Sequence, residues 1–421
     1  MIVLNSPEYI QKLLGSTDTN YFGKGFFYKP FKPFWKDGLI ASNGAKWKFR
    51  RSLMEKHMFS FKTVLSYMKI FNREGDTLVT EIGKHFSDGK EKAIDKLLFN
   101  AALESITQAG YGTSIADLKP LLSNPEFCLT HAVARVKEIV MTRMLKPWLY
   151  LDFIWNLHPM SKEEKILIEC GRNLILAGLS NDAEQPLKNN GVGMHRELMV
   201  AGVSLEGIIE ETITLVTAGY ETTANTLHFL LFFLALHPKH QKICREEVDS
   251  LYDDVDLCPS GFIEFRALSK LKHLEMCFYE TQRLLPTVFM IMRKIDIPLQ
   301  LDDDLKLPAG SEMLVYIPGL HKNPKYFPDP DNFIPERFSP EQSKSWHPYA
   351  FIPFAAGPRK CVGYKFATME ILTFVAKLLR SYEWETTERF EDVVLLPHIT
   401  TTPQTPMKFL FMKRDQQGNC E

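Results

Sequence analysis

Near its C-terminus the chain reads Phe354-Ala-Ala-Gly-Pro-Arg-Lys-Cys361-Val-Gly363, which places one cysteine in a loop between two glycines. Gly357 and Gly363 let the backbone turn and approach a ligand without a Cβ atom in the way. The apolar pattern of residues 364–379 predicts a helix, so Cys361 stands just before a helix N-terminus, where the dipole favours negative charge. Such a loop is suited to holding a thiolate, the form in which cysteine binds haem iron.

The alternative for a lone cysteine is a buried structural thiol that packs as a small hydrophobe. The neighbours of Cys361 favour the ligand hypothesis, because the pattern Phe-x-x-Gly-x-Arg-x-Cys-x-Gly resembles the haem-ligand loop of the cytochrome P450 family. Three further segments resemble other signatures of that family, in the same order along the chain. The resemblance implies that Cys361 is the axial ligand of haem iron and that Phe354, Gly357, Arg359 and Gly363 help to hold the cofactor.

Composition indicates an ordinary globular protein. The chain has 421 residues, of which 45% are hydrophobic, and a formal net charge of −1, so nothing points to nucleic acid as a partner. Its seven cysteines are odd in number and show no paired spacing. The cysteines therefore argue against a disulfide framework and against a zinc site, and they favour a reducing compartment.

The periodicity predicts a mostly helical chain. Residues 205–236 form one long apolar segment that Ser204 can cap and Pro238 stops, so we expect a single buried helix there. Alternating residues at 292–301 and 312–317 predict two strands of a small sheet. No repeat or linker divides the chain into domains.

The resemblance implies the cytochrome P450 fold, which is mainly α with small β-sheets. The haem would lie between the long central helix, at about residues 205–236, and the cysteine loop at 354–363. The whole chain, residues 1–421, is expected to form one such domain.

The start of the chain shows no signal-type apolar run, and its longest apolar run, at 227–236, is too short to span a bilayer. Microsomal members of the family begin with a membrane anchor, a first helix and a first strand. We therefore expect a domain that lacks these three segments, because residues 2–4 resemble the second strand of the opening sheet. The resemblance implies the cytosolic face of the endoplasmic reticulum membrane as the location.

Within the central helix, residues 218–223 place small residues, a carboxylate and hydroxyls where good helix formers are usual. A glycine there permits close approach, and a threonine that bonds back to a carbonyl bends the helix, which opens a groove beside a flat ligand. By resemblance to the oxygen-binding helix of the family, Thr222 faces dioxygen and Glu221 delivers protons, while Ala218 and Gly219 lie against the haem. The alternative is a satisfied core hydroxyl and a glutamate that pairs with a lysine.

Two sets of residues that contain arginines resemble sets with structural or cofactor-binding roles in the family. Glu280 and Arg283 lie three residues apart on a predicted helix with apolar flanks, and Arg337 can complete a buried ion network. Trp47 and Arg51 lie four residues apart and can reach one target together.

By resemblance, Trp47 and Arg51 bind a haem propionate, and Arg293 and Arg359 match two more propionate-binding positions. Arginine suits a carboxylate because its planar group donates two parallel hydrogen bonds. Solvated arginines on the surface are the alternative.

The predicted substrate pocket is apolar. It comprises Leu215, Ala218, Val288, Phe289 and Met290, which match pocket positions of relatives. The chain most resembles the animal fatty-acid-hydroxylase branch, with insect features. That branch often has a glutamate at the position of Ala218 that links to haem, so here haem b would be held non-covalently apart from the Cys361–iron bond.

The resemblance implies a haem-thiolate monooxygenase that inserts one atom of dioxygen into a C–H bond of a lipophilic substrate, such as a fatty acid, terpenoid or xenobiotic. Since the chain has no flavin or nicotinamide fingerprint, electrons would come from NADPH through NADPH–cytochrome P450 reductase, with cytochrome b5 as a further partner. An acidic donor could dock on a basic patch, which comprises Lys46, Lys48, Arg50, Lys360 and Lys365.

Two other hypotheses stay open. One is a haem-thiolate isomerase or dehydratase of lipid hydroperoxides, against which Glu221 and Thr222 argue, because such an enzyme needs no oxygen activation. The other is an inactive truncated copy, which the chain start and the short segment 181–202 motivate.

Overall fold

The computed structural model describes residues 1–421 except 113, 116–128, 185–193 and 415–421, so the centre of the short segment 181–202 lies outside the described residues. The helices are α1 (Pro7–Leu14), α2 (Lys32–Trp35), α3 (Gly44–Leu53), α4 (Phe61–Ser66), α5 (Met68–His85), α6 (Asp95–Tyr111), α8 (Leu129–Leu145), α9 (Asp152–Leu157), α10 (Pro159–Glu184), α11 (Met194–Val200), α12 (Leu205–Leu236), α13 (Pro238–Tyr252), α14 (Phe265–Leu268), α15 (Lys272–Leu284), α16 (Ile317–His321), α17 (Pro340–Ser343) and α18 (Tyr364–Ser381). The strands are β1 (Ile2–Leu4), β2 (Lys92–Ala93), β3 (Met290–Lys294), β4 (Leu299–Gln300), β5 (Lys306–Leu307), β6 (Glu312–Tyr316), β7 (Tyr382–Glu385), β8 (Leu395–Pro397), β9 (Thr401–Pro403) and β10 (Lys408–Lys413).

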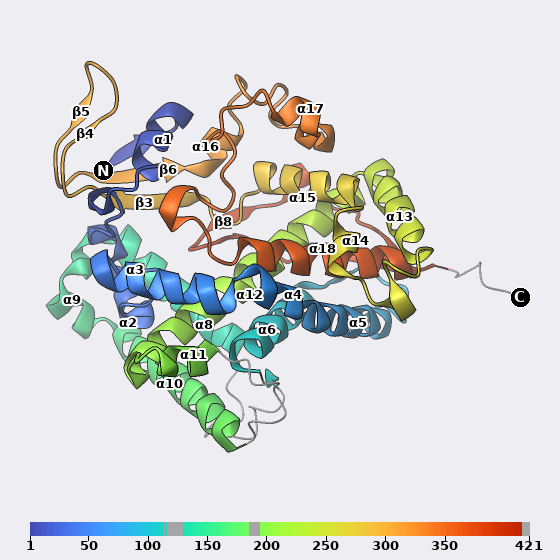
Figure 1. Cartoon of the computed structure of the whole chain (residues 1–421), viewed down its shortest axis with the longest axis horizontal. Helices are drawn as coiled ribbons and strands as arrows, with labels where there is room; N and C mark the ends of the chain where they lie inside the picture. The colour runs from blue at the N-terminus through green and yellow to red at the C-terminus, as the bar shows by residue number, and fades with distance from the viewer. Residues whose placement is uncertain (113, 116–128, 185–193, 415–421) are drawn as a thin grey trace, which may run out of the picture.

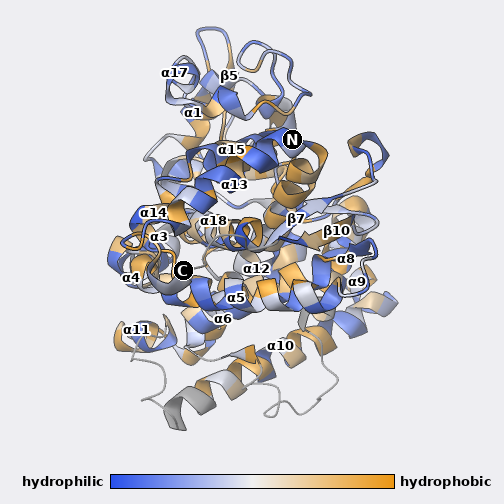
Figure 2. Ribbon diagram, turned by 90° about the vertical axis from the view of Figure 1, so that its right-hand side faces the viewer, coloured by the Kyte–Doolittle hydropathy of each residue, from blue (hydrophilic) through white to orange (hydrophobic). Residues whose placement is uncertain are grey.

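Long helices cross the centre of the molecule, and the sheet that contains β1, β3 and β6 lies at one end (Figure 1). In this sheet β6 is the middle strand, parallel to β1 and antiparallel to β3. Helix α10 lies at the edge, and hydrophobic and hydrophilic residues alternate along it (Figure 2). The prediction of a mainly helical fold with small sheets is confirmed. In the described part of the chain, no helix combines the length and apolar character that crossing a membrane requires.

The predicted strand at 292–301 is wrong in extent. Strand β3 ends at Lys294, and β4 pairs with β5 in a different sheet. The chain leaves the first sheet because the N–H of Asp296 donates to the carbonyl of Asn20, and Pro298 has no N–H to continue a ladder. Ile317, expected at the end of the second strand, begins α16 instead, with Pro318 in its first turn.

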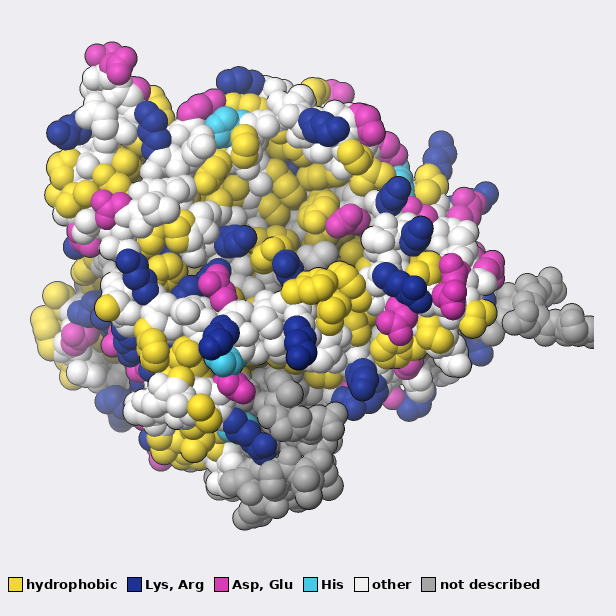
Figure 3. All heavy atoms as spheres, in the orientation of Figure 1, with side chains coloured by type: hydrophobic (Ala, Val, Ile, Leu, Met, Phe, Trp, Pro, Cys, Tyr) yellow, Lys and Arg dark blue, Asp and Glu magenta, His cyan; other side chains and the backbone are white. Residues whose placement is uncertain are grey.

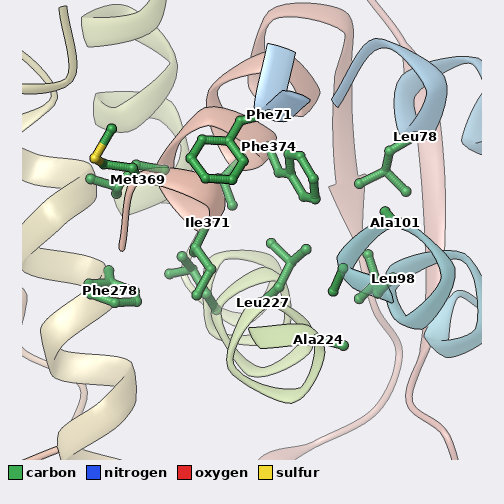
Figure 4. Packing of buried hydrophobic residues seen from close by; sticks show 14 of the residues in the cluster. Phe71, Leu78, Leu98, Ala101, Ala224, Leu227, Phe278, Met369, Ile371 and Phe374 are labelled. Carbon is green, nitrogen blue, oxygen red and sulfur yellow. The ribbon is translucent and has the colours of Figure 1, made fainter. Parts of the chain in front are cut away.

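The central helix α12 has the predicted bounds. The Ser204 hydroxyl accepts a hydrogen bond from the N–H of Gly207 at 3.2 Å, which caps the first turn. Ala224 and Leu227 of α12 lie between residues of α6 and α18, including Leu98 and Ile371 (Figure 4). The helix is therefore fixed on several sides by core packing, and its groove-forming residues have a rigid support.

A buried ion network joins α15 to the segment that precedes the cysteine loop. Arg283 donates to the Glu280 carboxylate at 2.6 and 2.9 Å, and both side chains are 0% exposed. Arg337 lies 3.5 Å from the same carboxylate. Arg283 also donates to the carbonyls of Pro330 and Asn332 at 2.6 and 3.0 Å, so the network holds the backbone of residues 328–338 against α15.

The cysteine loop turns at a position that only glycine fits. Gly357 has φ +70°, and an added Cβ atom would overlap the carbonyl oxygen of Leu14. Beyond this turn, the N–H of Cys361 donates to the carbonyl of Phe354 at 2.8 Å, and Gly363 is the N-cap residue of α18. The loop is thus pinned at both ends, with Cys361 three residues before Tyr364, the first residue of α18.

We expect Glu280→Ala to lower the free energy of unfolding by about 3–5 kcal/mol, because two buried guanidinium groups lose their shared carboxylate. Chemical denaturation of the purified protein measures this. Glu275→Ala, on a half-buried position of the same helix, is the matched control. Equal effects of the two substitutions would contradict the role of the network.

Gly357→Ala should destabilise the protein more than Gly310→Ala does. Both glycines have positive φ, at +70° and +84°, but no atom lies within 4 Å of an added Cβ at Gly310. Gly310→Ala therefore measures the backbone strain alone, about 1–3 kcal/mol, and Gly357→Ala adds the clash with Leu14. Thermal unfolding of the two variants separates these effects, and equal melting temperatures would show that the loop relaxes freely.

Candidate active site

A cavity of about 490 Å³ opens between α12 and the cysteine loop. The structure places most of the predicted residues on its wall: Trp47, Arg51, Leu215, Ala218, Gly219, Glu221, Thr222, Val288, Met290, Arg293, Phe354, Arg359, Cys361 and Gly363. These residues come from four separate segments of the chain, at 47–51, 215–222, 288–293 and 354–363. The fold therefore brings the predicted ligand, arginines, central-helix groups and pocket residues to one space.

Of the residues predicted to bind haem or substrate, two do not line this cavity. Phe289 is absent from the wall, although its neighbours Val288 and Met290 line it. Gly357 also lies off the wall, and it acts through the turn that it permits. Glu280, Arg283 and Arg337 lie outside the cavity too, as expected for a structural network.

Cys361 has its side chain open to the cavity while protein surrounds it on the other sides. Burial raises the pKa of the Cys361 thiol, and a hydrogen bond from the Gly363 backbone and the charge of Arg51 oppose that rise only in part. A bound iron ion would stabilise the thiolate in this position.

Four cationic side chains lie at one side of the cavity: Lys24, Arg51, Arg293 and Arg359. The Arg359 guanidinium lies over the Trp47 ring at 4.3 Å and donates to the carbonyl of Ser42 at 2.7 Å. Arg51 donates to the carbonyl of Lys360 at 2.7 Å, which connects α3 to the cysteine loop. In the described part of the chain, no carboxylate forms an ion pair with Lys24, Arg293 or Arg359.

These uncompensated charges indicate an anionic ligand. Burial, together with the charges of Arg293 and Arg51, lowers the pKa of Arg359 to about 9. Burial and the charges of Arg293 and Arg359 also lower the pKa of Lys24. The Nε of Arg359 is buried without a hydrogen-bond partner. Haem carries two carboxylates and an iron that takes one thiolate, so these residues fit haem in both charge and donor type.

Opposite the thiol, α12 provides the groove. The Thr222 hydroxyl donates to the carbonyl of Ala218 at 2.7 Å, as predicted for a bend at this point. Gly219 contacts α6 closely, because an added Cβ would lie 2.6 Å from Cγ1 of Ile106. Any larger residue at Gly219 would therefore push α12 away from α6.

The carboxylate of Glu221 has two partners in the structure. It accepts a hydrogen bond from the Thr400 hydroxyl at 2.5 Å and forms an ion pair with Lys137 of α8. Both members of the pair are buried at the cavity wall. The lysine partner weighed as the alternative for Glu221 therefore exists, and it holds the carboxylate next to Thr222.

Sequence reasoning missed three residues of the site: Lys24, Lys137 and Thr400. Lys24 lies in an irregular aromatic loop, and Lys137 lies on a helix of mixed polarity, where a lysine is ordinarily solvated. The one sequence signal for Lys137 was that it occupies a position of its helix where an apolar residue is typical. Thr400 gave none, because its contact with Glu221 spans 179 residues of chain.

Comparisons with known proteins agree with this geometry. The family model described as "Cytochrome P450" matches residues 1–411. The chain is similar to "Cytochrome P450 4V2" of Mus musculus, at 28% identity over 99% of this chain and 81% of that protein. It is also similar to two Drosophila melanogaster proteins. "Cytochrome P450 4c3" is 28% identical over 98% of this chain and 80% of its own length, and "Probable cytochrome P450 4aa1" is 32% identical over 90% and 73%.

These relatives confirm the resemblance to an animal branch that includes insect proteins. They also establish haem, bound through a cysteine thiolate, as the cofactor and monooxygenation as the class of reaction. The chain belongs to the cytochrome P450 family of haem-thiolate monooxygenases.

Proposed function

We propose that the protein hydroxylates a lipophilic substrate, with a fatty acid as the first candidate, and takes electrons from NADPH through a separate reductase. The observation that carries the proposal is the position of Cys361, which shares one cavity with the Thr222–Glu221 group of α12. In such a reaction one oxygen atom enters the substrate and the other leaves as water. When bound, the haem supplies the redox chemistry that activates dioxygen.

The protein's part is to hold the cofactor and to shape the reaction space. Cys361 would supply the thiolate that binds the iron, and Arg51, Arg293 and Arg359, which line the same cavity, would bind the propionates. Ala218 has no carboxylate that could form an ester with the cofactor, so haem b is held by non-covalent contacts and by the thiolate. Ala218 and Gly219 leave a flat surface on which a planar group can lie.

Proton delivery is assigned to Thr222 and Glu221. The Thr222 hydroxyl donates to its own helix and keeps its oxygen lone pairs open to the cavity. Glu221 lies one residue away, within a hydrogen-bonded group that includes Lys137 and Thr400. A proton that reaches this group from solvent can pass to Thr222 and then to the reacting oxygen, which is general acid catalysis.

The substrate class follows from the wall of the cavity beyond the haem residues. Leu215, Val288 and Met290 lie there, and the charged wall residues of α8 and α12, Lys137, Glu211 and Glu221, are held in ion pairs. Apolar walls favour a lipophilic chain or ring over a charged one. The chain most resembles the animal fatty-acid-hydroxylase branch of the family, and the relatives named above are animal proteins. A fatty acid is therefore the first substrate to test.

The basic patch proposed for the electron donor is smaller than the sequence predicts. Lys46 pairs with Glu210 at 2.9 Å, and Arg50 is buried against Glu211 at 3.1 Å. Lys48, Lys360 and Lys365 remain exposed. Basic side chains are scattered over the face formed by α3 and α4 (Figure 3).

An acidic reductase, and cytochrome b5 as a second donor, can approach at Lys48, Lys360 and Lys365, near the cysteine loop. The resemblance to microsomal relatives supports the endoplasmic reticulum membrane as the location.

Reconstitution tests the proposal. The purified haem-loaded protein, NADPH, a cytochrome P450 reductase and a panel of fatty acids, terpenoids and xenobiotics should yield products that gain one oxygen atom from ¹⁸O₂. Product from a fatty acid hydroperoxide, with none from NADPH and reductase, would instead favour the isomerase or dehydratase hypothesis.

Thr222→Ala should uncouple NADPH consumption from product. We expect product formation to fall by about 10²-fold while NADPH is still oxidised and hydrogen peroxide accumulates, because the positioned proton donor is lost. Thr373→Ala on α18, which removes a similar bond to the carbonyl four residues before it, is the control. Unchanged coupling in Thr222→Ala would assign the hydroxyl a purely structural role.

A further inference from the structure

Helices α13 and α15 each carry a histidine and a cysteine four residues apart. The pairs are His240 with Cys244 on α13, and His273 with Cys277 on α15. Residues four apart on a helix lie on the same face, one turn above the other. The two helices pack against each other, so the two pairs meet between them.

The donor atoms of this His-Cys cluster are close together. The Nδ1 of His240 lies 2.9 Å from the Nε2 of His273, and the sulfurs of Cys244 and Cys277 are 3.8 Å apart. The ligand atoms of His240, His273 and Cys277 all lie within 4.8 Å of one another. Both cysteines are fully buried, and His273 is 7% exposed.

We propose that His240, His273 and Cys277 form a binding site for one Zn²⁺ ion, and that the sulfur of Cys244, which lies outside the group within 4.8 Å but 3.8 Å from the sulfur of Cys277, moves toward the ion to become the fourth ligand. Zinc in structural sites takes four nitrogen and sulfur ligands in a tetrahedron, and two cysteines with two histidines are a common set. Two sulfurs bound at about 2.3 Å in a tetrahedron lie about 3.8 Å apart, which is the separation found here. Two bound nitrogens lie about 3.3 Å apart, so the imidazoles need to separate by only a few tenths of an ångström.

Charge and burial favour the same ion. Two thiolates balance the two charges of Zn²⁺, so the loaded site is neutral, as a buried position requires. Without metal, the two imidazoles share one hydrogen along the 2.9 Å line, and the ion takes the place of that hydrogen. The carboxylate of Glu336 lies 3.8 Å from the same Nδ1 of His240, so a negative charge stands beside the site.

The site is separate from the active-site cavity, because none of its four residues lines that cavity. It connects α13 to α15, and α15 carries Glu280 and Arg283 of the buried ion network. Cys277 lies three residues before Glu280. Zinc would therefore fix the position of α15. Because α15 holds residues 328–338, the segment before the cysteine loop, the role of the zinc would be structural.

Zinc titration of the haem-loaded protein tests the proposal. The protein is stripped with a chelator, kept reduced with a phosphine, and titrated with Zn²⁺ against a chromophoric competitor. We expect one zinc per chain with submicromolar affinity, and a melting temperature that rises on loading. Cys277→Ala should weaken zinc binding by more than about tenfold. His240→Gln, at a partly exposed position, should do the same.

Matched controls distinguish this site from adventitious binding. Cys258→Ala removes a buried cysteine elsewhere in the core, and His237→Gln removes a neighbouring histidine outside the cluster. Both should leave zinc binding unchanged. Absence of tight zinc binding by the reduced protein, or equal affinity in Cys277→Ala, His240→Gln and the controls, would overturn the proposal. The haem absorption of each variant verifies that it is folded, and His240→Gln keeps the test valid if Cys277→Ala fails to fold.

Discussion

The buried carboxylate of Glu280 is the constraint on which the site depends. It accepts hydrogen bonds from Arg283 and from the N–H of Ile334, and Arg337 lies 3.5 Å away, all in a part of the molecule without solvent. A buried charge of this kind is strongly destabilising when a partner is removed, so the network has one acceptable arrangement. That arrangement fixes residues 328–338 against α15, ahead of the cysteine loop.

The active-site cavity presents the opposite case, a set of charges without partners. Lys24, Arg293 and Arg359 line this space without an ion pair to any carboxylate of the described chain, and the pKa of the Cys361 thiol is raised there. Each of these features is unfavourable in the protein alone, and bound haem would relieve each of them, because its propionates can pair with the cations and its iron can bind the sulfur. Cofactor binding and stability are therefore coupled, because a ligand that binds only the folded state stabilises it.

Local sequence was sufficient for the parts of the fold that depend on local rules. The glycines around Cys361, the cap at Ser204 and the stop at Pro238 act through backbone geometry, and they predicted the loop and the bounds of α12. Contacts between distant segments were not predictable. The pairing of Glu221 with Lys137 spans 84 residues. The cysteines show no paired spacing along the chain, yet the free thiols of Cys244 and Cys277 meet between two helices.

The strand break at Asp296 has a similar origin. The residues after Lys294 alternate as a strand does, but the carbonyl of Asn20 takes the N–H of Asp296 out of the sheet. Phe289 was misplaced because the apolar run at 288–290 does not show which of its side chains reach the cavity. In both cases the residue types were as predicted, and contacts with distant parts of the chain decided where the residues lie.

The central claim is that Cys361 supplies a thiolate to haem iron in a folded pocket, and the carbon monoxide difference spectrum of the dithionite-reduced protein tests it most directly. The account predicts a strongly red-shifted Soret band for the protein and for Cys258→Ala, and its loss in Cys361→Ala. A protein without that band, or one in which Cys361→Ala retains it, would contradict the account.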